Sequence, residues 1–448
     1  MQFIYLFLSL YFGRKNPLYY LIFPFALSQG SGALIDTRFN LGMEMFLKNN
    51  SFKTISFVYL VFIFIYLKNK FKINKYGESI IHHYALYIVF LIISTLLISQ
   101  LEYNAVNVIG TWVQMVVGFY SIRYIYICSN RTQFYEFINV MILVTSIQSI
   151  LYCLNSSNIV KLFDPNMVYQ ELDFGNASFN RDFGTFPILG FLLYSYSLAN
   201  LFFNDLNINK KYSFLLIASY SVALFLCFTR TLLASAAAIF VVIAFIRLFK
   251  RKANDHFQFR NIIIMGIIAF GLYVVILSYF PSQLEYLIFR FTDNKSVGTD
   301  YSYIVRMQNL YDAIKLLSSD LISNLFGGGL NKSLYTYMSI HGSWLADTTI
   351  PVLLIHTGML GVLFYFCIEV FYIIRLIPIF NKEKDPLLIV LILGIGINIA
   401  NETFAGGRDW GDPLIFHYQI LASYLIFTYS RFNKNGQIKS FSNNSSLQ

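Results

Sequence analysis

Long apolar runs recur from one end of the chain to the other and are separated by shorter polar connections. A helix needs about 20 mainly apolar residues to cross a bilayer, and these runs reach or approach that length. The pattern predicts an all-α polytopic membrane protein with about twelve transmembrane helices, forming a single membrane domain over residues 1–448. The expected spans lie near 17–36, 53–67, 81–100, 105–127, 134–154, 184–203, 212–228, 231–247, 261–279, 348–374, 386–401 and 412–430.

Two stretches depart from this pattern. Residues 2–12 are apolar but too short to span and end at a polar turn, so we interpret them as an interfacial helix, with a signal-like stub or an extra half-span as alternatives. Residues 280–347 form a large external loop before the third-last span. Apolar residues recur there at near-helical spacing, with Pro281 and Gly327-Gly328-Gly329 as punctuation. We therefore expect a structured loop with amphipathic helices on the membrane surface.

Composition supports the membrane interpretation and narrows the chemistry. The residue types AVILMFWYC make up 56% of the chain and charged residues only 12%, about half of the roughly 25% typical of a soluble domain. An ordinary soluble enzyme is thereby excluded. The four cysteines stand singly within apolar segments, so neither a disulfide framework nor zinc-ligand spacing is predicted.

The net charge of +10 is unevenly distributed along the chain. Alternate loops, together with both ends, contain 21 of the 33 Lys and Arg residues but only 6 of the 23 Asp and Glu residues. These are residues 13–16, 68–80, 123–136, 204–211, 247–260, 375–385 and 431–448. Because basic residues concentrate in cytoplasmic loops, this bias predicts that both termini are cytoplasmic. The basic charge therefore reports topology, and nucleic acid is not an expected partner.

The arginines that lie in external segments need a separate explanation. They are Arg38, Arg181, Arg230, Arg290, Arg306 and Arg408. Arg230 lies between two spans with almost no loop, at the N-terminus of the second span. A guanidinium beside a helix N-terminus suits a phosphate or diphosphate. The alternative is an interface residue that snorkels or pairs with an external carboxylate.

The large external loop supplies further candidates. Arg306 lies on its amphipathic part, where pairing with a nearby aspartate is the plainer alternative. His341 and Asp347 stand immediately before the next span, and either side chain could accept a proton from a sugar hydroxyl. An interfacial polar cluster anchored by Trp344 is the alternative there. The sequence leaves open which of the two is the base.

Other polar groups are candidates for sugar binding. Arg408, Asp409 and Trp410 stand among turn-forming glycines and have the composition of a sugar platform, although an ion pair with a membrane-belt tryptophan would look the same. His356 lies one or two turns inside a span, where polar residues are costly and often functional. Arg181 belongs to the external loop at about 155–183.

The strongest local pattern runs from Tyr303 to Phe364. It comprises an amphipathic helix with Arg306, the Phe-Gly-Gly-Gly turn at 326–329, His341, and an apolar helix with Gly358 and Gly361. Together with the twelve spans, this pattern resembles the O-antigen polymerase and ligase superfamily, which includes the Wzy-type polymerases. His341 is followed by glycine rather than the asparagine of the family pattern.

This resemblance implies a GT-C-like fold and an inverting, metal-independent glycosyl transfer at the outer face of a bacterial cytoplasmic membrane. Donor and acceptor would both be oligosaccharides carried on undecaprenyl diphosphate, with no cofactor and with a chain-length regulator as a further partner. Arg230 and Arg306 would bind the diphosphate, and His341 or Asp347 would act as the base. The sequence leaves two other hypotheses open, an O-antigen ligase and a flippase or transporter of lipid-linked oligosaccharides. Because Glu369 is the only carboxylate well inside a span, an enzyme is favoured over a transporter.

Overall fold

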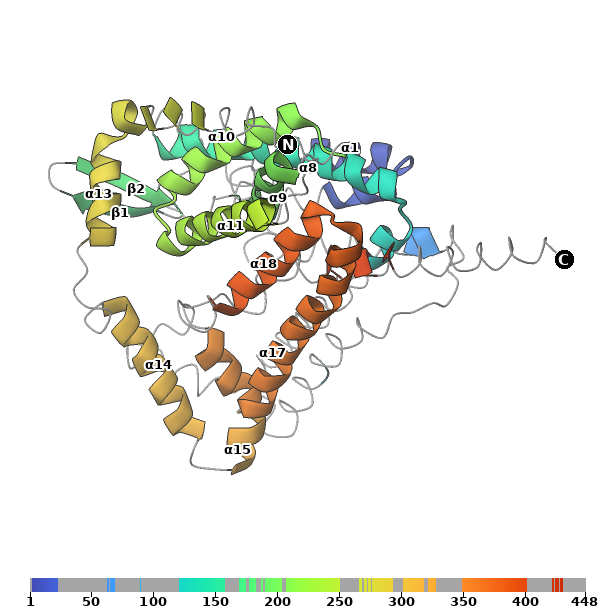
Figure 1. Ribbon diagram of the computed structural model, residues 1–448. Coiled ribbons are helices and arrows are strands. Elements are labelled where there is room, and N and C mark those ends of the chain that lie inside the picture. Colours follow the sequence, from blue (N-terminus) through green and yellow to red (C-terminus); the bar gives the residue numbers. More distant parts are fainter. Residues whose placement is uncertain are drawn as a thin grey trace. The chain divides into compact units, whose positions relative to one another are not determined.

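The computed structural model is predominantly helical (Figure 1). It describes residues 2–22, 63, 65–68, 89, 121–157, 169–174, 177–182, 187, 190–203, 207–249, 266–267, 270–271, 273–274, 276–292, 301–317, 321–327, 349–400, 421–422, 424–426 and 428–429. The chain divides into two compact units, which are described separately. Unit 1 contains residues 1–58 and 129–297, and unit 2 contains residues 59–128 and 298–448. The prediction of a single membrane domain stays a prediction.

Unit 1 contains four helices at predicted spans. Its described elements are α1 (Gln2–Gly13), the short 3-10 helix η1 (Pro17–Leu21), α8 (Arg131–Ser156), β1 (Tyr169–Phe174), β2 (Ala177–Asp182), α9 (Gly190–Phe203), α10 (Lys210–Leu226), α11 (Arg230–Phe249) and α13 (Pro281–Thr292). Helices α8 to α11 match four successive predicted spans. Helix α1 confirms the expected N-terminal helix, while its interfacial placement stays a prediction.

Local capping explains where α8 and α10 begin. The Asn130 side chain accepts the Gln133 N–H at 2.8 Å, and the Gln133 side chain accepts the Asn130 N–H at 3.0 Å. This reciprocal pair satisfies two donors that the first turn of α8 would otherwise leave unpaired. At α10, the Asn209 side chain accepts the Lys211 N–H at 3.0 Å. Asn139, in the third turn of α8, links this helix to the start of α10, because its side chain donates to the Asn207 carbonyl and accepts the Asn209 N–H.

Close packing joins α8, α9 and α10 near the start of α9. A side-chain carbon on Gly190 would collide with the Thr145 side chain and lie 2.8 Å from the Tyr220 ring, so only glycine fits there. The Tyr220 hydroxyl donates to the Pro187 carbonyl at 3.0 Å, and the Tyr194 ring stacks on the Tyr220 ring with centroids 5.0 Å apart. Aromatic rings and glycine together set the spacing of these helices.

Contacts at one end of unit 1 bring together connections that the sequence assigns to the cytoplasm. The Asn16 side chain donates to the Gln133 carbonyl at 2.8 Å, and the Gln133 side chain donates to the Lys15 carbonyl at 3.1 Å. The Arg247 guanidinium lies 5.9 Å from the centre of the Phe203 ring at the same end. Alternate loops must share one side if successive helices each cross the bilayer, and this arrangement meets that requirement.

The described elements of unit 2 include one long apolar helix, one shorter apolar helix and two loop helices. These are α14 (Tyr301–Leu317), α15 (Leu321–Phe326), α17 (Thr349–Glu383) and α18 (Pro386–Ala400). Asp385 caps α18 by accepting the Leu387 N–H at 2.9 Å, and it also accepts the Tyr429 hydroxyl at 2.7 Å. The rings of Tyr126 and Tyr424 lie 5.0 Å apart. Segments far apart in sequence are thereby joined within this unit.

The described part of the chain contains three helices long and apolar enough to cross a membrane. They are Arg131–Ser156, Arg230–Arg247 and Thr357–Glu383, and two shorter apolar helices are Gly190–Phe203 and Pro386–Ala400. The predicted spans outside the described residues, and so the count of twelve and a GT-C-like arrangement, stay predictions.

Two sequence-based expectations require refinement. The helical class is confirmed, but the connection predicted at 155–183 contains an antiparallel β-hairpin, which an all-α assignment omits. The predicted span 348–374 is part of a longer element, α17, in which two helices meet at Gly358. The loop 280–347 is helical where described, as predicted, but α13 belongs to unit 1 whereas α14 and α15 belong to unit 2.

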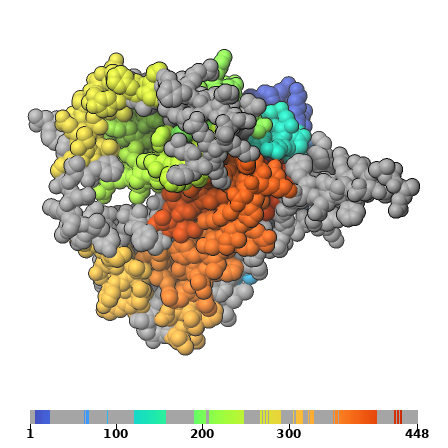
Figure 2. Space-filling view, in the orientation of Figure 1, coloured from blue at the N-terminus to red at the C-terminus, as the bar shows by residue number. Residues whose placement is uncertain are grey.

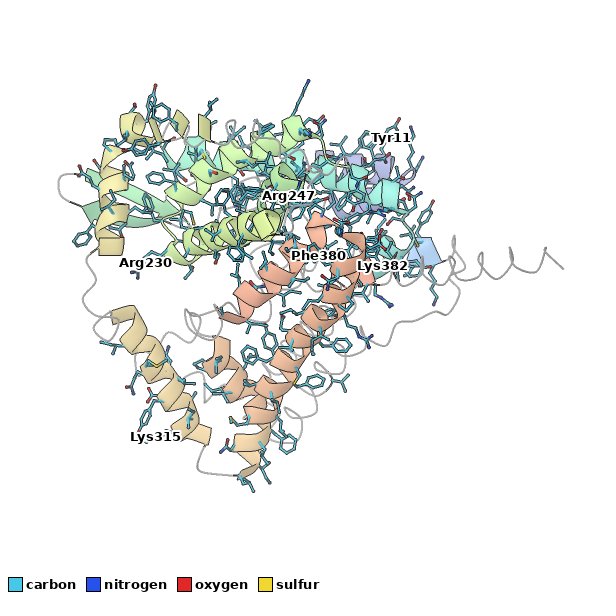
Figure 3. All side chains as sticks on the ribbon, in the orientation of Figure 1. Tyr11, Arg230, Arg247, Lys315, Phe380 and Lys382 are labelled. Atoms are coloured by element: carbon cyan, nitrogen blue, oxygen red, sulfur yellow. The ribbon has the colours of Figure 1, made fainter. Side chains whose placement is uncertain are left out.

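We expect the two ends of unit 2 to lie on opposite sides of the membrane. Lys315 on α14 and Lys382 on α17 are both exposed and stand in segments predicted to be external and cytoplasmic, respectively (Figure 3). In a cysteine-free background, a membrane-impermeant maleimide should label Lys315→Cys in intact cells but label Lys382→Cys only after permeabilisation. Labelling of both from outside would contradict the topology.

Candidate functional site

The tight turn between α10 and α11 positions Arg230. Phe228 adopts a left-handed backbone with φ 52° and is buried, which is uncommon for a residue with a side-chain carbon. The Thr229 hydroxyl and the Cys227 thiol lie 2.8 Å apart, and the Thr229 carbonyl accepts the Leu233 N–H at 3.1 Å. The turn is therefore bonded to itself on both sides of Phe228, and α11 begins directly at Arg230.

Aromatic packing fixes this turn against α13. The Phe228 ring meets the Tyr286 ring edge-on with centroids 5.7 Å apart, and the Phe225 ring lies 6.5 Å from the Phe280 ring. Phe228 is thus held in its strained conformation by packing from two sides. This rigid base supports the first turn of α11, where Arg230 is half-buried.

The electrostatic character of this helix start favours an anion. The first turn of α11 contains no acidic residue, and a helix N-terminus carries about half a positive charge. Arg230 adds a full positive charge with several donors in one plane. Arg247 stands near the other end of the same helix (Figure 3), about 25 Å away along the axis at 1.5 Å per residue. The two arginines therefore belong to opposite ends of unit 1.

In unit 2, the break in α17 is a contact point for the loop helix α15. Gly358 has φ 62° and ψ −168°, a conformation open only to glycine without strain. A side-chain carbon there would lie 2.5 Å from the Gly327 nitrogen and from the Leu325 carbonyl carbon. Gly327 itself has φ 77°, and these two are the positive-φ glycines among the described residues. Both special glycines thus meet at one backbone-to-backbone contact.

Helix α14 contains Arg306. On the same helix Asn309 and Ala313 are fully buried, and α14 packs against α17 within unit 2. His356 stands two residues before the break in α17. Two sequence-predicted site residues, Arg306 and His356, thus belong to helices that pack together.

The other predicted site residues are distributed differently. Arg230 belongs to unit 1, and so does Arg181, which lies on β2 opposite Gln170 in the hairpin register. The candidate bases His341 and Asp347 lie outside the described residues. The predicted sugar-binding group Arg408, Asp409 and Trp410 also lies outside them.

Tertiary structure draws attention to four residues that sequence reasoning did not select for the site. Gly327 and Gly358 were recognised only as part of the family pattern, because their mutual contact has no signature in the sequence. Asn309 is 0% exposed. Its position one helical turn after Arg306 is the feature of the sequence that could have identified it. Glu369 is 1% exposed within α17. No group of three or more His, Cys, Asp or Glu in the described part of the chain could hold a metal ion.

Comparison of the chain with protein-family models and with curated proteins gives no match.

We expect Gly358→Ala to lower the stability of unit 2. The substitution forces alanine into a left-handed conformation and drives its methyl group into the α15 backbone, which should cost about 1–3 kcal/mol. Gly396→Ala in α18 is the matched control, because a side-chain carbon there meets nothing within 4 Å. Thermal unfolding in detergent micelles measures both variants. Equal unfolding temperatures would show that the α15 contact does not constrain Gly358.

Proposed function

We propose that the protein is a polymerase of lipid-linked oligosaccharide repeat units for a bacterial surface polysaccharide. The substrates on both sides of the reaction are oligosaccharides carried on undecaprenyl diphosphate. The proposed location is the outer face of the cytoplasmic membrane, with both termini in the cytoplasm. A chain-length regulator and the bilayer itself are the expected partners.

The reaction is an inverting glycosyl transfer. A hydroxyl oxygen of the acceptor sugar attacks the anomeric carbon of the donor while the bond from that carbon to the diphosphate oxygen breaks. The base, His341 or Asp347, takes the hydroxyl proton, and the diphosphate leaves with the bonding electrons. Negative charge therefore develops on the leaving diphosphate, which is where positive groups lower the barrier.

The observation that carries the proposal is the construction of the α11 start. A half-buried arginine, a helix whose first turn contains no acidic residue and a turn fixed by Phe228 together suit a diphosphate. This start lies at the end of α11 away from Arg247, and so away from the connections assigned to the cytoplasm. The expected external position of Arg230 therefore agrees with a lipid diphosphate at the outer membrane boundary.

Arg306 gives separate support from unit 2. Arg306 belongs to α14, which packs against the long apolar helix α17. The contact between α15 and Gly358 holds this part of the loop against a helix that is long enough to span the membrane. We propose that Arg306 is the second diphosphate-binding residue and that His356, Arg181, Arg408, Asp409 and Trp410 bind sugar.

We expect Arg230→Ala and Arg306→Ala each to reduce polymer formation by about 10²–10³-fold, because each removes charge stabilisation of the leaving group. Lysine at either position should restore only part of the activity, since it keeps the charge but loses the planar donors. Polymer length is measured with purified protein and lipid-linked repeat units in vesicles.

Matched controls lie on the same two helices. Arg247→Ala at the other end of α11 and Lys315→Ala on the exposed face of α14 should leave polymer length unchanged. Normal polymer from both Arg230→Ala and Arg306→Ala would overturn diphosphate binding. If wild-type protein fails to elongate repeat units but transfers them to a different acceptor, the ligase hypothesis replaces the polymerase hypothesis.

The base should be identified by comparing His341→Ala with Asp347→Ala. Loss of the base should cost about 10²–10⁴-fold in turnover, whereas the other variant should retain most activity. A histidine base works in its neutral form, so wild-type kcat/KM should rise with pH through about 6.5, the usual pKa of histidine. A rise centred near pH 4 would favour Asp347. Near-wild-type turnover of both variants would remove both from the mechanism.

A further inference from the structure

The exposed side of α14 is divided lengthwise into an apolar and a polar half. Ile304, Met307, Tyr311 and Ile314 follow one another at intervals of three or four residues and are 48%, 41%, 61% and 52% exposed. Gln308, Asp312 and Lys315 occupy the adjacent stripe, where the Gln308 side chain donates to the Asp312 carboxylate at 2.8 Å. The opposite face contains the buried Asn309 and Ala313. We call the first four residues the apolar stripe.

This division suits a boundary between lipid and water. A helix packed on protein along one face and exposed on the other needs no large apolar side chains on its exposed face. At 17 residues, α14 is about 25 Å long. Because polar residues occupy part of its circumference along this length, it is not a transmembrane span. An amphipathic helix of this kind lies at the membrane interface, with its apolar side toward the acyl chains.

Helix α17 provides the neighbouring lipid-facing surface. Six of its exposed positions, Met359, Leu363, Cys367, Val370, Ile374 and Ile377, recur every three or four residues and are apolar or a thiol, and the exposed Arg375 lies beside the last two of them. They extend over about 27 Å at 1.5 Å per residue, close to the roughly 30 Å of a hydrocarbon core. An exposed, mainly apolar stripe of this length is expected to face lipid.

Helix α15 connects the two surfaces. Its backbone at Leu325 and Gly327 touches Gly358, which immediately precedes Met359, the first residue of the α17 stripe. Leu321 and Ile322 on α15 are 73% and 59% exposed. In the space-filling view, α15 and α17 form one continuous surface (Figure 2). The apolar surface thus continues from the spanning helix onto the loop helices at its Gly358 end.

We propose that the apolar stripe of α14, together with α15, inserts among the acyl chains of the bilayer leaflet that surrounds the Gly358 end of α17. The occupant of this surface is lipid rather than a protein partner, because the surface is continuous with the lipid-facing side of α17. Helix α14, which contains Arg306, is thereby held at the membrane boundary. This inference is independent of the proposed enzymatic activity.

Spin labels on α14 test the proposal. Single cysteines replace Ile304, Tyr311, Gln308 or Lys315 in an otherwise cysteine-free full-length protein, with Leu363→Cys on α17 as the lipid reference. The protein is reconstituted into vesicles of phosphatidylethanolamine and phosphatidylglycerol. Oxygen, which concentrates in lipid, and a water-soluble nickel chelate then report on each label by power saturation.

Labels at Ile304 and Tyr311 should behave like the label at Leu363, with a ratio of oxygen to nickel accessibility several-fold higher than at Gln308 and Lys315. The polar pair serves as a matched control on the same helix and reports whether α14 is folded. Equal nickel accessibility at all four α14 positions would overturn the proposal in favour of a water-exposed helix. Protection of Ile304 and Tyr311 from both reagents would overturn it in favour of a protein partner or another segment of this chain.

Discussion

The contact between Gly358 and the backbone of α15 is the constraint on which the described loop region of unit 2 depends. It requires glycine twice, at Gly358 and at Gly327, because both backbones are left-handed and no side-chain carbon fits at Gly358. A short helix of six residues could not hold its position by its own stability. Docking into the break of a long apolar helix fixes α15 in place, and α14, which ends three residues before α15 begins, packs against the same helix.

Unit 1 also fixes a backbone in an unusual conformation, but it does so with aromatic packing rather than with glycine. The start of α11 has no glycine, and Phe228 accepts a left-handed backbone because aromatic rings from the same turn and from α13 hold it there. Strain of this kind persists only where surrounding packing overdetermines it, and it tends to accumulate at functional positions. In both units, therefore, a predicted external arginine belongs to a segment whose backbone is fixed by unusual tertiary contacts rather than by helix propensity alone.

A site residue could be predicted from the sequence only where its type is unusual for the segment that contains it. Arg230 is unusual because basic residues are rare in predicted external segments; in the structure it lies at the end of α11 away from Arg247, and its external position stays a prediction. Arg306 could be assigned to an amphipathic helix, but the packing of that helix against α17 and the burial of its Asn309 and Ala313 could not be predicted. Contacts between residues distant in sequence leave no periodic signal, so Gly358 could not be matched to Gly327.

The sequence by itself determined the helical class, the positions of α8 to α11 and α18, and the sorting of basic residues into alternate connections. These follow from local physics. Lipid requires apolar helices with internally bonded backbones, and basic residues concentrate in the connections on one side of the membrane. Only the tertiary structure decided that α17 breaks at Gly358, that the 155–183 connection forms a β-hairpin, and that the large loop divides between two units. The break at Gly358 and the division of the loop depend on contacts between segments separated along the chain, which exist only after folding, whereas the β-hairpin pairs neighbouring strands that the apolar pattern does not mark.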